Sequence, residues 1–132
     1  MGQPAAKQGD RVVAVDTHIV MVPAPPGPPA PTPLPHPFAG LLSGGLSADV
    51  KISGRSAATV GSTADNVPPH VPAAPGSFQR PPANKGTIQQ GSPTVKINGK
   101  PAARNGDKAL TCNDPADLPA GTVVAAGTVL IG

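Results

Sequence analysis

The sequence predicts an all-β fold, a small closed assembly of three short repeat units related by a pseudo-threefold axis. Three observations predict it. One sequence frame recurs along the chain, valine and isoleucine alternate with other residues as in half-buried strands, and proline interrupts nearly every window that could form a helix. Because the chain has 132 residues, we expect a single domain over residues 1–132.

The repeat is the first of these observations. Residues 50–62 read VKISGRSAATVGS and residues 95–107 read VKINGKPAARNGD, aligned without a gap. A third copy is split between the two ends of the chain, with its back half at residues 4–10 (PAAKQGD) and its front half at residues 128–131 (TVLI). We therefore expect the last strand to return and complete the first unit.

Each copy contains a Val-x-Ile pair with the two-residue period of a half-buried strand. The glycine that follows the isoleucine in two copies suits a turn with positive φ. An Ala-Ala-x-x-Gly turn comes next, and its small side chains would let three such segments approach one axis. Closure of the three hairpins would hide the strand edges. The six strand residues, which either fill the core or are exposed at the base to contact a partner, are Val50, Ile52, Val95, Ile97, Val129 and Ile131.

Two long Pro-rich segments separate the units, at residues 23–37 and residues 68–82. Such segments are typical of polyproline-II linkers or of ligands for PxxP-binding domains. Alternatively, they are ordered surface loops, in which proline presets φ so that little entropy is lost on folding. A histidine lies inside each segment, and this favours ordered loops.

The composition indicates a thin core that needs further stabilisation. The chain has 2 aromatic residues, both Phe, and 1 Cys, which cannot form an internal disulfide. A metal ion or a partner chain usually stabilises such a domain. The net charge of +3 is too small to keep the chain open. The basic residues are dispersed and have no interleaved aromatics, which argues against nucleic-acid binding.

The sequence also bears on localisation. No apolar stretch is long enough to span a membrane, and the N-terminal residues lack the apolar core of a signal peptide. We therefore expect synthesis in the cytoplasm without export by the usual signal route.

The histidines and the cysteine predict a metal site. His18 and His70 each lie eight residues after the end of an aligned repeat frame, and Cys112 lies in the same connection of the third unit. A pseudo-threefold axis would therefore bring these three side chains together. His36, which has no counterpart in the repeats, adds a fourth donor from the Pro-rich segment. Three nitrogens and one sulfur form a closed tetrahedral set, which suits one structural zinc ion and leaves no position for a reactive water.

The repeat frame resembles a known family. Residues Pro101, Ala102, Ala103 and Arg104 spell the motif after which the PAAR-repeat proteins are named, and the resemblance extends over essentially the whole chain. The segments PHPF at residues 35–38 and TCND at residues 111–114 resemble the PAAR-like tip proteins of contractile injection machines. The second copy reads SAAT at residues 56–59, so the named motif is complete only once.

The resemblance implies a short β-cone with zinc held near its apex by three histidines and one cysteine, here His18, His36, His70 and Cys112. It implies that the base of the cone caps a trimeric β-helical spike, with one tip per trimer. It further implies a non-enzymatic role, in which the tip sharpens the spike, makes transient contact with the target membrane and helps to breach the cell envelope.

The resemblance also implies where the protein acts. Such a tip is made in the bacterial cytoplasm, assembled at the end of the particle and delivered outward on firing. A phage tail, a type VI secretion system and an extracellular contractile particle would all accept it. Many members carry effector toxins as extensions. This chain resembles a bare tip, so we expect any cargo effector to be a separate protein.

Two other functions fit parts of the sequence. A hydrolase with a zinc-activated water would need an open coordination position and a nearby base. The chain has no glutamate, and the candidate bases near Cys112 are Asp114 and Asp117. A largely disordered, zinc-binding adaptor would instead present its Pro-rich segments to a signalling domain.

Overall fold

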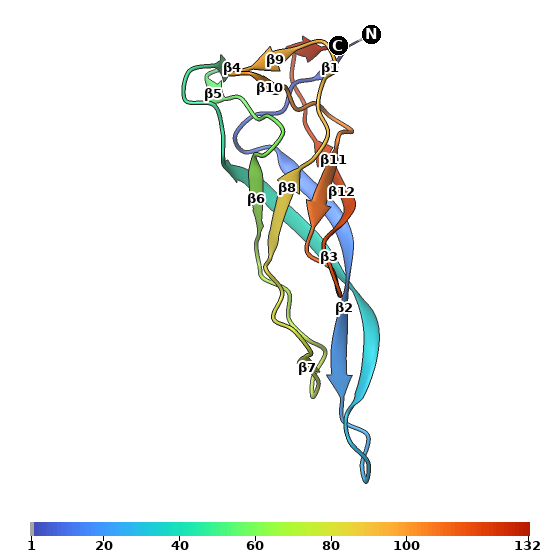
Figure 1. Ribbon diagram of the computed structural model, residues 1–132. Helices are drawn as coiled ribbons and strands as arrows, with labels where there is room; N and C mark the ends of the chain where they lie inside the picture. The colour runs from blue at the N-terminus through green and yellow to red at the C-terminus, as the bar shows by residue number, and fades with distance from the viewer. Residues whose placement is uncertain (1) are drawn as a thin grey trace.

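A computed structural model describes residues 2–132, and this part of the chain is built from strands and loops without a helix (Figure 1). The predicted all-β class is therefore confirmed. No described segment forms a helix of the length and hydropathy that crossing a membrane requires. The strands are β1 Gln3–Pro4, β2 Arg11–Val22, β3 Ala30–Gly44, β4 Lys51–Ile52, β5 Arg55–Ser56, β6 Thr63–Asn66, β7 Ser77–Phe78, β8 Lys85–Ile88, β9 Lys96–Ile97, β10 Lys100–Pro101, β11 Lys108–Thr111, β12 Leu118–Val124 and β13 Leu130–Ile131.

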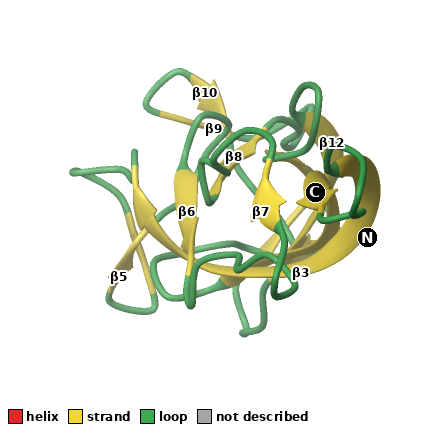
Figure 2. Ribbon diagram, turned by 90° about the horizontal axis from the view of Figure 1, so that it is seen from below, coloured by secondary structure: helices red, strands yellow, loops and turns green. Residues whose placement is uncertain are grey.

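Six of these strands close into an antiparallel barrel. β2 pairs with β3, the order continues through β6, β8, β11 and β12, and β12 returns to pair with β2. Figure 2 looks into this part of the molecule from the end at which the molecule narrows. The barrel encloses the main apolar core, whose largest side chains are Val12, Phe38, Leu42, Ile88 and Val123.

Three short hairpins lie at the broad end of the molecule, where both chain termini also lie (Figure 1). They are β4–β5, β9–β10 and a third two-stranded unit, also called a hairpin here, in which β13 from the end of the chain pairs antiparallel with β1 from its beginning. In this third hairpin Gln3 lies opposite Ile131 and Pro4 lies opposite Leu130. The prediction that the last strand completes the first repeat unit is confirmed.

The hairpins share a second apolar cluster. It consists of one isoleucine and one alanine from each repeat unit: Ala5, Ile52, Ala57, Ile97, Ala102 and Ile131. The three isoleucines are only 6–8% exposed, and Val50 and Val95 pack partly buried against them. Val129, in contrast, is 41% exposed. The isoleucines of the predicted strands are therefore core residues of the base.

The Ala-Ala turns meet on the pseudo-threefold axis. The amide of Ala6 donates to the carbonyl of Ala103 at 2.9 Å, Ala103 donates to Ala58 at 3.0 Å, and Ala58 donates to Ala6 at 3.0 Å. The three backbones therefore form a closed triangle of hydrogen bonds. All three alanines have 0% exposure. Larger side chains would have no room here, which explains the recurrence of alanine.

The end of each repeat frame closes its own turn. Asp10, Ser62 and Asp107 each accept a hydrogen bond from the backbone N–H three residues earlier, at 3.0, 3.0 and 2.7 Å. The glycine that precedes each of them has a φ of 89°, 94° and 90° in the three copies, a conformation that favours glycine. The three copies of the sequence frame therefore form the same turn with the same hydrogen bond.

The long β2–β3 hairpin runs from the barrel to the narrow end (Figure 1). β3 begins at Ala30, so the prediction of a Pro-rich loop over residues 23–37 is wrong for residues 30–37. Pro31, Pro33, Pro35 and Pro37 alternate along this strand and are all exposed. Proline has no N–H, so it fits every second position of a strand whose other edge is free. In the described chain, β6 pairs with β3 only from Gly40 onward, which leaves that edge free.

The second Pro-rich segment runs back along the long hairpin. Within residues 68–82 it forms the short strand β7, which pairs with β2 at Val20 and Met21. The second segment is thus ordered against the hairpin, as the loop interpretation predicted, whereas residues 30–37 of the first segment are a strand of the hairpin itself. Neither arrangement fits the disordered adaptor.

Candidate metal centre

Three of the four predicted metal ligands converge between the barrel and the narrow end. His18 lies on β2, His70 follows β6, and Cys112 follows β11 directly. One ligand atom from each of these residues, and one from Asp16, all lie within 4.8 Å of one another. The Asp16, His18 and His70 side chains are at most 2% exposed, and Cys112 is 3% exposed. This buried cluster has the donor atoms to hold a metal ion.

His36, the fourth predicted ligand, packs against this cluster. Its ring centroid lies 5.4 Å from the ring centroids of both His18 and His70, which are 5.0 Å apart. The Nδ1 atom of His36 lies 3.0 Å from the carbonyl oxygen of Leu34. A proton on Nδ1 would make this hydrogen bond and leave the lone pair on Nε2 for a metal. His36 is not one of the four residues within the 4.8 Å set, so its role as a ligand stays a prediction.

Asp16 is the member of the cluster that the sequence analysis missed. Its carboxylate is 0% exposed. Oδ1 accepts hydrogen bonds from Thr111 Oγ1 at 2.5 Å and Asn113 Nδ2 at 3.4 Å. Oδ2 lies 3.0 Å from His70 Nε2 and 3.5 Å from Cys112 Sγ. These partners satisfy both oxygens of the buried carboxylate and fix its position beside His70 and Cys112.

The position of Asp16 in the chain carried a signal for this role. Asp16 lies two residues before His18, so both side chains fall on the same face of β2, and both are buried. In the register of the hairpin, Asp16 also lies directly opposite His36. An acidic residue at this spacing on a strand of buried side chains needs a charged or polar partner.

The loop after β11 holds Cys112 beside His18. β12 pairs with the first residues of β2 and β7 pairs with its end, which leaves the middle of that edge without a strand. There the amide of Thr17 donates to Asn113 Oδ1 at 2.7 Å, and the amide of Ile19 donates to Asp114 Oδ2 at 2.9 Å. Two side chains thus take the place of a neighbouring strand.

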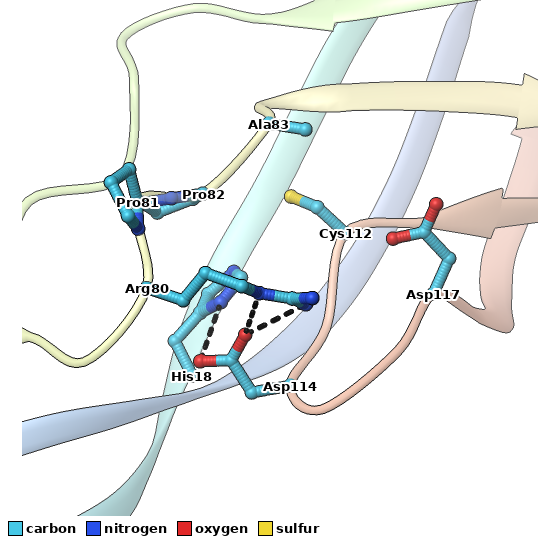
Figure 3. Close-up of a pocket in the computed structure, with 8 residues that line it drawn as sticks. All are labelled: His18, Arg80, Pro81, Pro82, Ala83, Cys112, Asp114 and Asp117. Atoms are coloured by element: carbon cyan, nitrogen blue, oxygen red, sulfur yellow. Dashed lines mark hydrogen bonds and ion pairs between the residues drawn. The ribbon is translucent and has the colours of Figure 1, made fainter.

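A pocket of about 240 Å³ opens beside His18 and Cys112 (Figure 3). On this side, His18 Nδ1 lies 3.6 Å from Asp114 Oδ2, which is too long for a hydrogen bond. Among residues 2–132, neither ring nitrogen of His18 finds a hydrogen-bond partner, although both are buried. Buried polar atoms are nearly always paired, so these nitrogens fit a site that binds a metal ion.

The surroundings of the cluster shift the pKa values of His18, Cys112 and Asp114. Burial lowers the pKa of His18, so its imidazole is neutral at pH 7. Burial, and next the Asp16 carboxylate, raise the pKa of the Cys112 thiol to about 11. Burial opposes ionisation of Asp114, but the Ile19 amide, His18 and Arg80 outweigh this effect and lower its pKa.

Both aromatic residues of the chain contact the histidines. The Phe78 ring centroid lies 5.6 Å from that of His18 and 5.3 Å from that of His36, and Phe38 lies 6.2 Å from His70. The histidines therefore form part of the apolar packing below the barrel, in a region that has few large apolar side chains.

The hydrolase interpretation finds little support at this site. Asp114, one of its two candidate bases, is paired with Arg80 at 3.0 Å and accepts the Ile19 amide. Asp117 is exposed at the rim of the pocket.

Comparison with known proteins identifies the repeat frame. The family model described as PAAR motif matches residues 34–115 and residues 78–132. Comparison with curated proteins found no match. The matched part of the chain contains both complete copies of the frame, together with His36, His70 and Cys112. Because the two matches together span most of the chain, this protein belongs to the PAAR-motif family.

Proposed function

We propose that this protein is the non-enzymatic tip of a contractile injection machine, which caps and sharpens a trimeric β-helical spike. The PAAR motif implies a spike-tip role in such systems and interaction with a spike protein. The observation that carries the proposal is the base, where the hydrogen bonds of one monomer repeat three times around an axis. A single chain with this pseudo-symmetry is suited to cap a partner with true threefold symmetry.

The hairpins at the broad end are the proposed contact with the spike. Val129, just before β13, and Leu130, on β13, are 41% and 59% exposed, whereas Ile52, Ile97 and Ile131 support the hairpins from within the core. We therefore place the contact on the exposed side of the hairpins and assign to the isoleucines the role of holding them in place.

The buried centre is proposed to hold one structural zinc ion. His18, His36, His70 and Cys112 would be its ligands, with the carboxylate of Asp16 beside them. Zinc would contribute binding free energy to the folded state and would fix the narrow half of the molecule against the barrel. Imidazole nitrogens and a thiolate sulfur are ligand types that zinc prefers, which favours zinc over harder ions.

The proposed place of action follows from this role. The protein would be made in the bacterial cytoplasm, assembled at the end of the particle and carried outward on firing, with transient contact with the target membrane during puncture.

The experiment that tests the tip function is co-purification with a trimeric β-helical spike protein from the same organism. Light scattering of the complex should give the mass of one tip bound to three spike chains. The test variant is Leu130→Asp, on the exposed side of a hairpin. Its matched control is Leu118→Asp, at a leucine that is 50% exposed on the barrel strand β12. Loss of binding in the first variant alone supports the base as the contact. Absence of a complex with the wild-type protein contradicts the proposed function.

A further inference from the structure

We propose that Asp114, held in place by Arg80, is a positioning residue for the metal centre: it orients the His18 imidazole so that Nδ1–H points to the carboxylate and Nε2 points to the metal. This inference rests on the proposed zinc site. It adds to that site a carboxylate outside the ligand set.

The geometry of the carboxylate is fixed from several sides. The Asp114 side chain is 4% exposed. Its Oδ2 accepts the amide of Ile19, the residue next to His18 in the chain, at 2.9 Å. Its own amide donates to the carbonyl of Thr17, the residue on the other side of His18, at 2.9 Å. Asp114 is therefore attached to the backbone on both sides of the histidine that it faces.

Arg80 fixes the other carboxylate oxygen. Its Nε lies 3.2 Å and its Nη2 3.0 Å from Asp114 Oδ1, and Nη2 also donates to the carbonyl of Asn113 at 2.8 Å. Figure 3 shows the Arg80 side chain extended over the Asp114 carboxylate at the mouth of the pocket. The Arg80 side chain is 55% exposed, so it can balance the charge of the buried carboxylate while remaining partly in water.

The remaining contact is the one to His18. Nδ1 of His18 lies 3.6 Å from Asp114 Oδ2, and neither ring nitrogen has a hydrogen-bond partner in the part of the chain that the structure describes. A proton on Nδ1 would interact favourably with this carboxylate, and the lone pair would then lie on Nε2. Metal-bound histidines generally donate their second N–H to a carboxylate or a carbonyl, and the long contact would shorten when Nε2 binds the metal.

The test is zinc affinity, measured in the full-length protein by competition with a chromogenic chelator. Asp114→Ala should weaken zinc binding about 10–100-fold. Asp114→Asn should weaken it less, because the side-chain amide oxygen of asparagine can still accept the Ile19 N–H and the Nδ1–H of His18. The matched control is Asp117→Asn, which removes an exposed carboxylate from the same pocket. Arg80→Ala, which removes the ion pair to the other carboxylate oxygen, should have a smaller effect in the same direction.

A second measurement separates orientation from loop stability. Two-bond ¹⁵N–¹H spectra of the zinc-loaded protein distinguish the two imidazole nitrogens. Wild-type and Asp114→Asn proteins should show metal on Nε2 and a proton on Nδ1 of His18, and Asp114→Ala should show faster exchange of that proton. Metal on Nδ1 of His18, or Asp114 variants that bind zinc as tightly as Asp117→Asn, would overturn this inference and leave the proposed zinc site standing. A wild-type protein that binds no zinc would overturn both this inference and the proposed zinc site.

Discussion

The thiol of Cys112 makes metal binding depend on pH. Its pKa of about 11 means that the metal-free thiol is protonated at pH 7, whereas a metal binds the thiolate. The pKa of His18 is lowered by burial, so this imidazole releases no proton at neutral pH. We therefore expect zinc affinity to rise about tenfold per pH unit between pH 7 and pH 9, as one proton is released per ion.

Calorimetry in buffers with different ionisation enthalpies measures this released proton directly. Cys112→Ala removes the thiol and should release none. If the zinc affinity of the wild-type protein is constant from pH 7 to pH 9, the thiol is not a ligand.

Five donor residues surround a centre that needs four, and two variants separate the candidates. Asp16 already interacts through both carboxylate oxygens with its neighbours, whereas the Leu34 carbonyl leaves Nε2 of His36 for the metal. We expect His36→Gln to change the visible absorption bands of bound Co²⁺, which report the ligand set. Asp16→Asn should keep the bands and weaken binding about 10–100-fold. The opposite pattern would place Asp16 in the ligand set and His36 outside it.

Among the single residues of the centre, the sequence predicted His18, His70 and Cys112 as metal ligands because they occupy related positions in the repeat. Asp16 has no equivalent residue in the other units, so the repeat alignment could not find it. Its role depends on the register of the β2–β3 hairpin, which sets Asp16 opposite His36. That register follows from packing along the whole hairpin and could not be derived from the repeat frame.

Among the structural elements, the triangle of Ala-Ala turns should tolerate substitution least. Ala58 is fully buried on the axis, and its amide and carbonyl both belong to the triangle. Ala58→Val should lower the free energy of unfolding by about 1–3 kcal/mol through overpacking. Urea unfolding measures the change. Ala24→Val, in the exposed turn at the narrow end, is the control and should stay within about 0.5 kcal/mol of wild type. Equal effects at both positions would contradict the tight packing on the axis.

The elements also show why β3 was missed. Proline is rare in strands because it removes a hydrogen-bond donor, and residues 23–37 therefore resemble a loop. The sequence signal for a strand was the alternation of proline with Thr32, Leu34 and His36. This alternation places the prolines of β3 on one face of the strand. Composition alone does not distinguish this pattern from polyproline II, whereas pairing with β2 along its whole length does.

The whole molecule is held together differently in its two halves. The broad half contains the barrel core and the cluster of isoleucines and alanines under the hairpins. The narrow half has the long hairpin, the segment that contains β7 and the loop at Asn113, which are joined by few apolar side chains and by the histidine cluster. The metal would therefore stabilise the part of the tip that lacks an extensive core.

Hydrogen exchange with and without metal tests this division. Removal of zinc by a chelator should lower the melting temperature and expose amides in residues 66–85 and at Asp114, because these segments pack around the cluster in the half of the molecule that has few apolar side chains. The amides of Ala6, Ala58 and Ala103 should keep their protection, since their hydrogen bonds and packing do not involve the cluster. Cys112→Ala, which lacks a ligand, should respond much less to the chelator. If chelation leaves both the melting temperature and the exchange pattern unchanged, the centre does not stabilise the fold. If protection is lost evenly over the chain, the two halves unfold as one unit and the metal acts on the whole tip.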